Sequence, residues 1–480
     1  SREGEMLFRH LYGFLGCKQP CLRLWISSLT DEAITEGMAN LLPCDRFDNL
    51  FLAADSRNRA DWLLGVNSSY AICKAVGFGN NSLGRVQTPV LAEICRRYRE
   101  RENHMPADSW PVFISLCKND RILKMRHVDD LVVRREALAL YEDCKAAKSV
   151  RITAVGKRTE EIGAPALYNL AELQKDANRY HSLTAIQVQE IAQGLYEKKL
   201  ISYPRTSSRL LPKDVYDTLP PVMEKMLSRK EFRQYADTVD LAAPRDSIEA
   251  QDTMEHHAII ITGTQPGKLD REEMLVYTLI VGRMLETFMP PCKVEYTTVD
   301  TVCAARKFRI RTYRILEKGW LGIFEREHLV AKGCMPYLVM PDLFQEEILP
   351  VAGCSLIHKK SLPVSPYTDE ELVDYMDKAG LGTVSTRTNI LRTLLERKYI
   401  RYSGKYVVPT PKGLFLYETV RSMKVADASL TSGWETELAR IERGELSQEK
   451  FLDGVLETVN EVTGEIFRNH PVKKRQQGTT

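Results

Sequence analysis

Two strand-like stretches lie far apart in this chain, and the residues between them follow a helical pattern. In 112–126 and again in 293–316, apolar and polar side chains alternate, as in a strand with one buried face. Residues 163–289 instead carry apolar side chains at helical spacing. The sequence therefore predicts one β-rich domain, 109–162 and 290–355, that is interrupted by a helical insertion.

Length and composition indicate a globular protein of several domains. At 480 residues, with 44% apolar and 27% charged residues, the chain is too long for one core, and we expect roughly three or four domains. No apolar run approaches the roughly 20 residues of a membrane span. The first residues do not resemble a signal peptide, so the expected location is cytoplasmic, without a membrane partner.

Charge and cysteine usage exclude little by themselves. A net charge of +3 does not argue for nucleic acid, although the basic clusters Arg96–Arg101 and Lys473–Arg475 leave open either a binding patch or a solvated surface. The eleven cysteines are scattered singly and form no C-x-x-C pair, so no zinc ribbon is expected. Scattered cysteines in a chain of this size predict reduced, mostly buried thiols.

Residues 366–466 follow the pattern of a winged helix. Thr368-x-x-Glu371 predicts a helix start, and Gly380 and Gly382 interrupt the helix. Ser385 or Thr386 is expected to begin a second helix, and Ser403-Gly404 to turn a short hairpin. A winged helix commonly binds nucleic acid, although a purely structural helical pair fits the same pattern.

The residue types around Tyr203 suit attack on a phosphodiester. Pro204 disfavours helix at Tyr203, and in an extended segment Tyr203 and Arg205 share a face. A phenol has a pKa near 10, so it needs a nearby positive charge to act as a nucleophile at neutral pH. Arg205 can supply that charge and hold a phosphate with two hydrogen bonds. Taken alone, a tyrosine beside an arginine is more often structural.

Three further stretches offer polar groups that could reach such a site. Gln193 and Glu197 lie one helical turn apart, which fits either a solvated face or a site with Glu197 as a proton-transfer group. His256 and His257 are adjacent, so at most one is expected to face a site. The Ser82–Pro89 segment resembles a helix start, where phosphates bind readily, although a simple capped helix fits it as well.

In this order, these segments resemble the type IA DNA topoisomerases, and more closely their topoisomerase III branch. The resemblance spans about residues 1–466. It is carried by the segments Arg59–Gly65, Ser82–Pro89, Pro165–Leu170 with Leu173, Gln174 and Asn178, Gln193–Ser208, His256–Ile259 and Gly382–Arg387.

The resemblance implies a multidomain α+β ring with winged-helix-type helical domains and a β arch. The implied domains are a C-terminal Toprim remnant (1–40), a helical base with the winged helix (41–108 and 356–466), the β arch (109–162 and 290–355), the catalytic tyrosine domain (163–289) and a basic tail (467–480).

The resemblance also implies an isomerase reaction without ATP. Tyr203 would cut one strand of single-stranded DNA through a 5′-phosphotyrosine link, a second strand would pass, and the break would be resealed. Arg205 and His256 would contact the scissile phosphate, and Glu197 would assist near the tyrosine. The residues implied to bind DNA are Arg85, Gln87, Gln193, Ser202, Ser385 and Thr386.

The metal site departs from the family pattern. The family implies Mg²⁺ held by an acidic run in the Toprim domain, and here only Glu3 fits that run, as a catalytic and metal-ligating group of a partial site. We therefore expect an N-terminally truncated chain that is inactive or poor at resealing, that binds no zinc, and that acts as a monomer. Two alternatives remain: a non-catalytic single-strand DNA-binding remnant, and a tyrosine recombinase. The position of Tyr203 in the middle of the chain argues against the recombinase.

Overall fold

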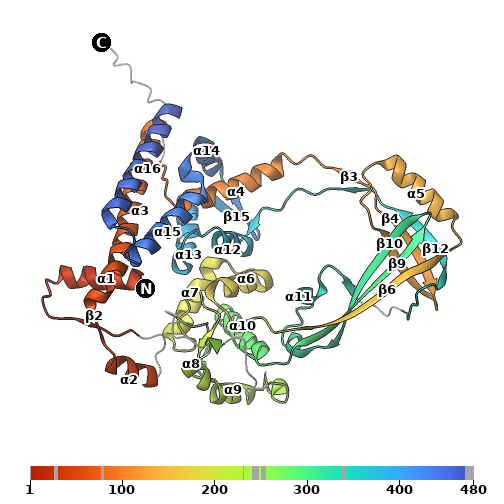
Figure 1. Ribbon diagram of the computed structural model, residues 1–480, viewed down its shortest axis with the longest axis horizontal. Coiled ribbons are helices and arrows are strands. Elements are labelled where there is room, and N and C mark those ends of the chain that lie inside the picture. Colours follow the sequence, from red (N-terminus) through yellow and green to blue (C-terminus); the bar gives the residue numbers. More distant parts are fainter. Residues whose placement is uncertain are drawn as a thin grey trace, which may run out of the picture.

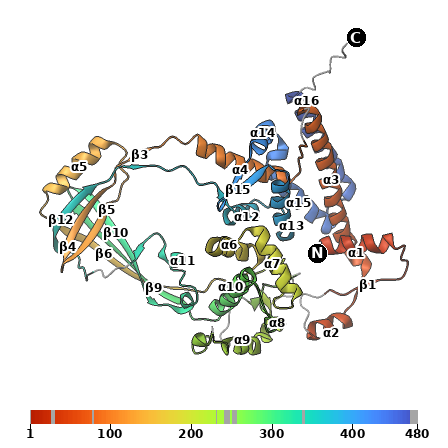
Figure 2. The same cartoon turned by 180° about the vertical axis from the view of Figure 1, so that it is seen from behind.

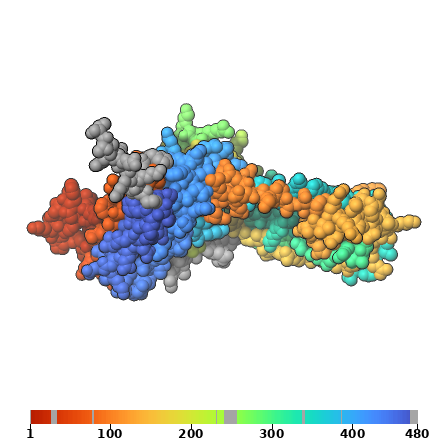
Figure 3. Space-filling model, turned by 90° about the horizontal axis from the view of Figure 1, so that it is seen from above, coloured from red at the N-terminus to blue at the C-terminus, as the bar shows by residue number. Residues whose placement is uncertain are grey.

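The chain forms a ring-like circuit of helices and one large sheet in the computed structural model (Figures 1 and 2). Helices from both ends of the chain form a base, and the sheet lies at the opposite end as an arch. Seen from above, the arch is a narrower arm than the base (Figure 3). The structure describes residues 2–25, 31–76, 80–230, 232–239, 248–249, 256–336 and 341–470, so Glu255 and the basic cluster Lys473–Arg475 lie outside the described residues.

The base is held together by apolar stripes on long helices. On α16, Phe451, Val455, Val459, Val462 and Ile466 recur at helical spacing, and all five are buried against α3. The expected helices 56–75 and 86–104 correspond to α3 and α4. The base helices are α1 (Arg2–Phe14), α3 (Asp48–Val76), α4 (Gln87–Glu102), α12 (Asp369–Lys378), α13 (Val384–Glu396), α14 (Pro411–Val420), α15 (Ala428–Glu442) and α16 (Gln448–Asn469), and α2 (Asp31–Ala39) follows α1 along the chain.

Between α12 and α14, the base contains the expected hairpin. Strands β15 (Ile400–Ser403) and β16 (Tyr406–Pro409) pair around Gly404, and β14 (Tyr367–Thr368) adds to the free edge of β16. The predicted cap of α12 is confirmed, since the Thr368 side chain accepts from the Glu371 N–H at 3.2 Å. The predicted start of the next helix, Ser385 or Thr386, is wrong by one or two residues. Helix α13 begins at Val384, because the Thr386 hydroxyl accepts from the Thr383 N–H at 2.9 Å and fixes Thr383 as its cap.

The large sheet of the arch closes on itself. Its strand order is β11-β10-β5-β4-β12-β6-β9, and β9 also pairs with β10 along its whole length. Side chains such as Ile114, Met125, Ile152 and Phe308 fill the interior, and α5 (Arg134–Ala146) packs on β12. The strands are β4 (Val112–Lys118), β5 (Arg121–His127), β6 (Ser149–Ile162), β9 (Cys292–Cys303), β10 (Arg306–Glu317), β11 (Met335–Pro336) and β12 (Ile348–Leu356), with the short pair β3 (Asp108–Ser109) and β13 (Lys359–Lys360) at the base side.

The residues between β6 and β9 form a helical unit with its own core. Tyr168, Leu195, Ile259 and Ile280 are among its buried side chains. Thr184 caps α7 as predicted, accepting from the Gln187 N–H at 3.2 Å. The unit contains α6 (Leu170–His181), α7 (Ala185–Glu197), α8 (Lys213–Asp217), α9 (Leu219–Leu227), α10 (Arg271–Thr287), and the paired strands β7 (Leu211–Pro212) and β8 (Ile248–Glu249), while the short α11 (His328–Ala331) follows β10.

The expectation that every thiol is reduced is wrong at one pair. Cys21 and Cys44 form a disulfide. The reason is local topology, because β1 (Leu22–Arg23) pairs antiparallel with β2 (Leu42–Pro43) and brings the two cysteines opposite one another. None of the helices in the described ranges is long and apolar enough to span a bilayer.

Candidate active site

Tyr203 lies just after α7, on a segment that hydrogen bonds hold in place. The Ser202 N–H donates to the Ile260 carbonyl at 2.8 Å, and its hydroxyl accepts from the Ile260 N–H at 3.0 Å and donates to the Ala258 carbonyl at 3.1 Å. Ile201 forms a β-bridge with Ile261 in the same stretch. Ser202, which was expected to bind DNA, thus fixes the backbone position of the tyrosine beside it.

The ring of Tyr203 contacts two other aromatic side chains. The His256 ring lies 4.6 Å away between centroids, and the Tyr196 ring meets it edge-on at 5.4 Å. The structure therefore brings together Tyr203 and His256, which lie far apart in the sequence. Tyr196 was not singled out from the sequence. Its position one residue before Glu197, on the helix that leads to Tyr203, was the available signal.

The two adjacent histidines have different surroundings. His256 is exposed, and its backbone carbonyl accepts from the buried Thr206 hydroxyl at 3.0 Å, which positions the residue against Tyr203. His257 turns away and its Nδ1 donates to the Ala258 carbonyl at 2.7 Å. Burial lowers the pKa of His257, so its ring is neutral near pH 7. Of the two histidines, His256 is the one whose ring contacts Tyr203.

Arg205 sits two residues after Tyr203 with an unused donor. Its Nε–H is buried and has no hydrogen-bond partner in the part of the chain that the structure describes. Burying such a donor without a partner costs about 1–3 kcal/mol. An anion bound beside Tyr203 could accept this hydrogen bond, and a phosphate oxygen is the natural candidate.

Helix α7, which precedes Tyr203, has one buried face and one polar face. Val188, Ala192 and Leu195 are fully buried on one side of the helix, as predicted. On the other side, the Gln193 amide donates to the Glu197 carboxylate at 2.9 Å, and Glu197 is exposed. Gln193 and Glu197 thus line the exposed face of the helix whose last turn carries Tyr196.

A second group of predicted residues gathers where α4 and α13 begin. The Gln87 amide donates to the Ser82 hydroxyl at 3.1 Å at the start of α4. Gly382 has a φ of +75°, and a Cβ there would lie 3.1 Å from the Thr386 hydroxyl and 3.7 Å from Val86, so the two helix starts are neighbours. Ser385 lies in α13, and its side chain is outside the described atoms.

Arg85 belongs to this group by position, but its charge is already paired. Its Nε donates to Asp61 at 2.7 Å and its Nη1 to Glu435 at 3.0 Å, and its side chain is only 4% exposed. Burial acts to lower the pKa of Arg85, and the two carboxylates outweigh this and raise it. In this structure Arg85 joins α4 to α3 and α15.

Glu3 is exposed on α1, next to Arg2, which pairs with Glu435 at 2.8 Å. The nearby Glu5 is buried in ion pairs with Arg9 and Arg23, so it is not available as a ligand. Nowhere in the described ranges do three His, Cys, Asp or Glu side chains converge as metal ligands do. A magnesium ion needs several oxygen ligands, and Glu3 alone does not supply them.

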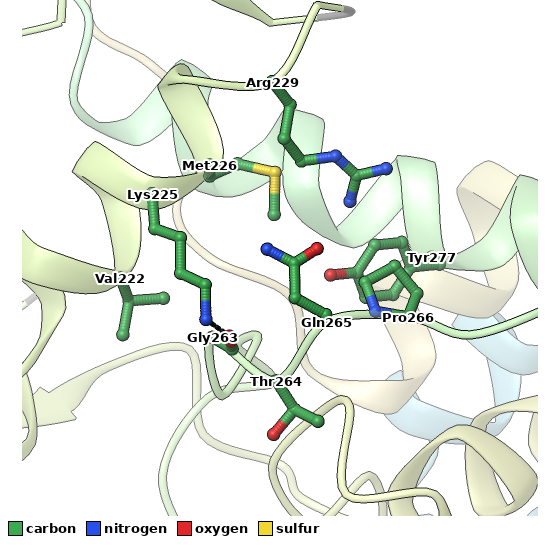
Figure 4. Close-up of a pocket in the computed structure, with 9 residues that line it drawn as sticks. All are labelled: Val222, Lys225, Met226, Arg229, Gly263, Thr264, Gln265, Pro266 and Tyr277. Atoms are coloured by element: carbon green, nitrogen blue, oxygen red, sulfur yellow. Dashed lines mark hydrogen bonds between the residues drawn. The ribbon is translucent and has the colours of Figure 1, made fainter.

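The helical unit also contains a pocket that is separate from Tyr203 (Figure 4). Arg229, Gln265 and Tyr277 are among the side chains that line it, and Lys225 closes one side by donating to the Gly263 carbonyl at 2.9 Å. Its volume of about 10 Å³ is the space of roughly one water molecule. A space of this size does not admit a nucleotide.

Comparison of the chain with known proteins shows which family it is similar to. A family model described as DNA topoisomerase matches residues 45–453. DNA topoisomerase 3 of Bacillus cereus is 29% identical over 97% of this chain and 67% of its own length, and that of Bacillus anthracis is 30% identical with the same coverage. DNA topoisomerase 1 of Methanocaldococcus jannaschii is 28% identical over 94% of this chain and 58% of its own length.

The fold agrees with these sequence matches. Full-length topoisomerase I from Thermotoga maritima superposes with a TM-score of 0.76 at 20% identity, covering 97% of this chain and 77% of that one. The family model alone spans well over half of the chain. The chain therefore belongs to the type IA DNA topoisomerases, a family of isomerases.

Proposed function

We propose that Tyr203 attacks a backbone phosphate of single-stranded DNA and cuts that strand. The observation that carries this proposal is the setting of Tyr203, on a hydrogen-bonded segment, against His256 and two residues before Arg205. A bond forms between phosphorus and the tyrosine oxygen, and the bond from phosphorus to the 3′ oxygen breaks. The products are a 5′-phosphotyrosine and a 3′-hydroxyl, which takes up a proton. The reverse attack reseals the strand and consumes no ATP.

Each side chain around Tyr203 would have its own role in the reaction. Arg205, through its unused Nε–H, would stabilise negative charge on the phosphate. His256 donates a hydrogen bond to a phosphate oxygen from the exposed side of the ring. Glu197 relays the proton between the phenol and solvent. Electrostatic groups of this kind contribute about 10²–10³-fold each to similar reactions.

The strand would run from Tyr203 towards the base. Gln193 on α7 offers amide groups near the break, with Ser202 in the segment behind it. Gln87 and Thr386 offer polar groups where α4 and α13 begin, and Ser385 and Arg85 belong to the same two helix starts. Helices α7 and α13 pack against one another, so the two groups would lie on one continuous surface. Helix starts favour phosphates because their N–H groups point outward.

Resealing would depend on a divalent cation more strongly than cleavage does. Family membership implies Mg²⁺, while Glu3 alone does not complete a magnesium site. We therefore expect covalent cleavage by the chain to proceed in EDTA and rejoining to be weak in Mg²⁺. Rejoining is measured by adding high salt after cleavage and following the loss of trapped complex. Full rejoining at millimolar Mg²⁺ would contradict this expectation.

Covalent trapping with two labels tests the main proposal. A single-stranded oligonucleotide labelled at its 3′ end is incubated with the chain, and denatured protein is examined for label. The 3′ label should stay on the protein, because the 5′ phosphate of that fragment is the bonded group. The same oligonucleotide labelled at its 5′ end should leave no label on the protein.

Two tyrosine variants identify the nucleophile. Tyr203→Phe should abolish the adduct. Tyr196→Phe keeps the ring contact with Tyr203 and should leave most of the adduct yield. Adduct in Tyr203→Phe would exclude Tyr203 as the nucleophile. DNA binding without any adduct in the unmodified chain would instead favour a non-catalytic single-strand binding protein.

A further inference from the structure

The small pocket of the inserted helical unit is lined by positive and hydrogen-bonding side chains (Figure 4). Lys225 lies in α9, Arg229 follows that helix, and Tyr277 lies in α10. Residues 263–266 supply a further wall. All nine lining residues are among those that the structure describes, and none of them is acidic. We call this space the Tyr277 pocket.

Tyr277 brings a buried hydroxyl to the pocket. The residue is only 2% exposed, and its Oη has no hydrogen-bond partner in the part of the chain that the structure describes. Burial raises the pKa of Tyr277, and the nearby charge of Arg229 acts against this change. The hydroxyl is therefore protonated at neutral pH and can donate. Because a buried hydroxyl without a partner is destabilising, a ligand that accepts its hydrogen would bind favourably.

Two positive charges face the same space. The Lys225 ammonium group donates to the Gly263 carbonyl at 2.9 Å, and Arg229 lies near the Tyr277 hydroxyl (Figure 4). A bound cation would meet these two charges and no carboxylate among the described lining residues. A bound anion would be attracted by both charges, and more strongly than on an open surface, because buried surroundings screen charges less.

The pocket admits only a very small ligand. Its volume of about 10 Å³ is the space of roughly one water molecule, so phosphate, sulfate and carboxylates do not fit. Gln265 is exposed, so its side chain can shift to admit an ion slightly larger than water and can turn an amide N–H towards it. A water molecule fits too, but it leaves the positive charges unbalanced. A single-atom anion suits both the size and the charge.

We propose that the Tyr277 pocket binds a halide ion such as chloride, which accepts hydrogen bonds from the Tyr277 hydroxyl and the Arg229 guanidinium. The proposal does not depend on strand cleavage, because the pocket is separate from Tyr203.

The bound ion would connect α9, α10 and residues 263–266. Thr262, directly before that segment, donates from its hydroxyl to the Lys199 carbonyl at 2.6 Å and from its N–H to the Leu200 carbonyl at 3.1 Å. The ion would thus stabilise the loop that follows the backbone contacts of the Tyr203 segment. Halide should therefore slow hydrogen exchange in α9.

Hydrogen exchange of the full chain in two salts tests the proposal. Peptides of α9 are followed by mass spectrometry in sodium bromide and in sodium glutamate of equal ionic strength, since glutamate is too large for the pocket. Exchange should be about tenfold slower at a tenfold excess of bromide over its dissociation constant. Equal exchange rates in the two salts would overturn the proposal.

Tyr277→Phe removes the hydroxyl and keeps the ring. In glutamate the variant should exchange in α9 as slowly as the unmodified chain or more slowly, because a buried donor without a partner is gone. In bromide it should exchange faster than the unmodified chain. Faster exchange by the same factor in both salts would mean that the hydroxyl holds water and would contradict a halide site.

Tyr235→Phe is the matched control in the same unit. It loses a hydrogen bond from the Tyr235 hydroxyl to the Gly322 carbonyl at 3.3 Å, so any change in exchange should be the same in both salts. Crystals grown in sodium bromide give a direct view. An anomalous bromide peak within hydrogen-bond distance of the Tyr277 Oη is expected, and a peak without anomalous signal, or no peak, would refute the site.

Discussion

Beside Tyr203, two arginines on one short segment serve different purposes. Arg205 leaves a buried Nε–H without a partner, whereas Arg209 donates to the carbonyls of Leu167 and Ala166, both at 3.1 Å. The first arrangement suits a ligand and the second stabilises the fold. These two arginines therefore separate a loss of chemistry from a loss of structure.

Arg205→Ala should lower the yield of trapped adduct by about 10²-fold or more, because one charged donor to the phosphate is lost. The thermal midpoint should stay the same or rise, since a buried unpaired donor is removed as well. Arg209→Ala is the matched control, and it should lower the midpoint more than it lowers the adduct yield of the protein that remains folded. Equal adduct yields in the two variants would count against a role for Arg205 at the phosphate.

His257 gives the fold a dependence on pH. Burial lowers its pKa, so the unfolded chain binds a proton near pH 6.5 more readily than the folded chain does. By linkage, this residue's contribution to stability is complete above about pH 6.5 and is lost as the pH falls below it. His257→Gln should therefore flatten the fall in unfolding free energy between about pH 7 and pH 5, as measured by urea titration. A fall of unchanged steepness in the variant would show that other groups cause it.

At the scale of elements, sequence patterns predicted local structure well and contacts poorly. The alternation at 112–126 and the cap at Thr184 depend on neighbours within a few residues, and both are present. The closure of the sheet, the contact of Tyr196 with Tyr203 and the ion pairs of Arg85 depend on partners that no local pattern specifies. The Tyr203 segment itself was found because its residue types suit one chemistry and because the family resemblance ordered it with the other segments.

Helix α14 of the base is linked to the start of α4 through Tyr399. A Cβ at Gly413 would lie 2.1 Å from the Tyr399 carbonyl oxygen, so α14 can pack there only with glycine. The Tyr399 hydroxyl in turn accepts from the Ser82 N–H at 2.7 Å. Displacement of Tyr399 would therefore reach the proposed DNA surface at Ser82 and Gln87.

Gly413→Ala should destabilise the base by more than about 2 kcal/mol, because a rigid backbone oxygen must move, and should weaken binding of a single-stranded oligonucleotide. Gly454→Ala is the control. That helical glycine has open space around its Cβ position, and the change should stabilise the chain by about 0.5–1 kcal/mol. Fluorescence anisotropy and urea titration of both variants check these outcomes. If Gly413→Ala changed neither stability nor oligonucleotide binding, the proposed link between α14 and the start of α4 would be contradicted.

For the whole molecule, the main interface is the seam between the inserted helical unit and α12 of the base. Lys175 pairs with Asp374 at 2.8 Å, Arg179 pairs with Glu370, and the Ala185 N–H donates to Asp369 at 2.7 Å. A cavity of about 390 Å³ lies along this seam, lined mostly by charged side chains. Ala171 of α6 and Ala185 of α7 belong to the same hydrophobic core as Met376 of α12, so apolar contacts and ion pairs both hold the seam closed.

The double variant Glu370→Gln with Asp374→Asn should loosen this seam. Partly exposed ion pairs contribute about 0–1 kcal/mol each, so global stability should change little, while hydrogen exchange in α6 and α12 should speed up. High salt should narrow the difference between the variant and the unmodified chain, because it screens the same pairs. Glu461→Gln, which breaks an exposed pair with Lys424 elsewhere in the base, should leave exchange in α6 unchanged. If hydrogen exchange in α6 is the same in the double variant and in Glu461→Gln, the ion pairs of the seam do not hold it closed.

The long pairing of β6 with β9 has a topological consequence. Register continues to the last residues, Ile162 opposite Cys292, so the inserted unit departs and returns at a single point. Opposed residues of antiparallel strands are only about 4.5–5.5 Å apart, so both covalent connections of the inserted unit meet the sheet at one place. Residues 163–291 are therefore an insertion whose two ends lie at one place in the sheet. A short hairpin turn between β6 and β9 could replace these residues, and the closed sheet would keep all of its strands.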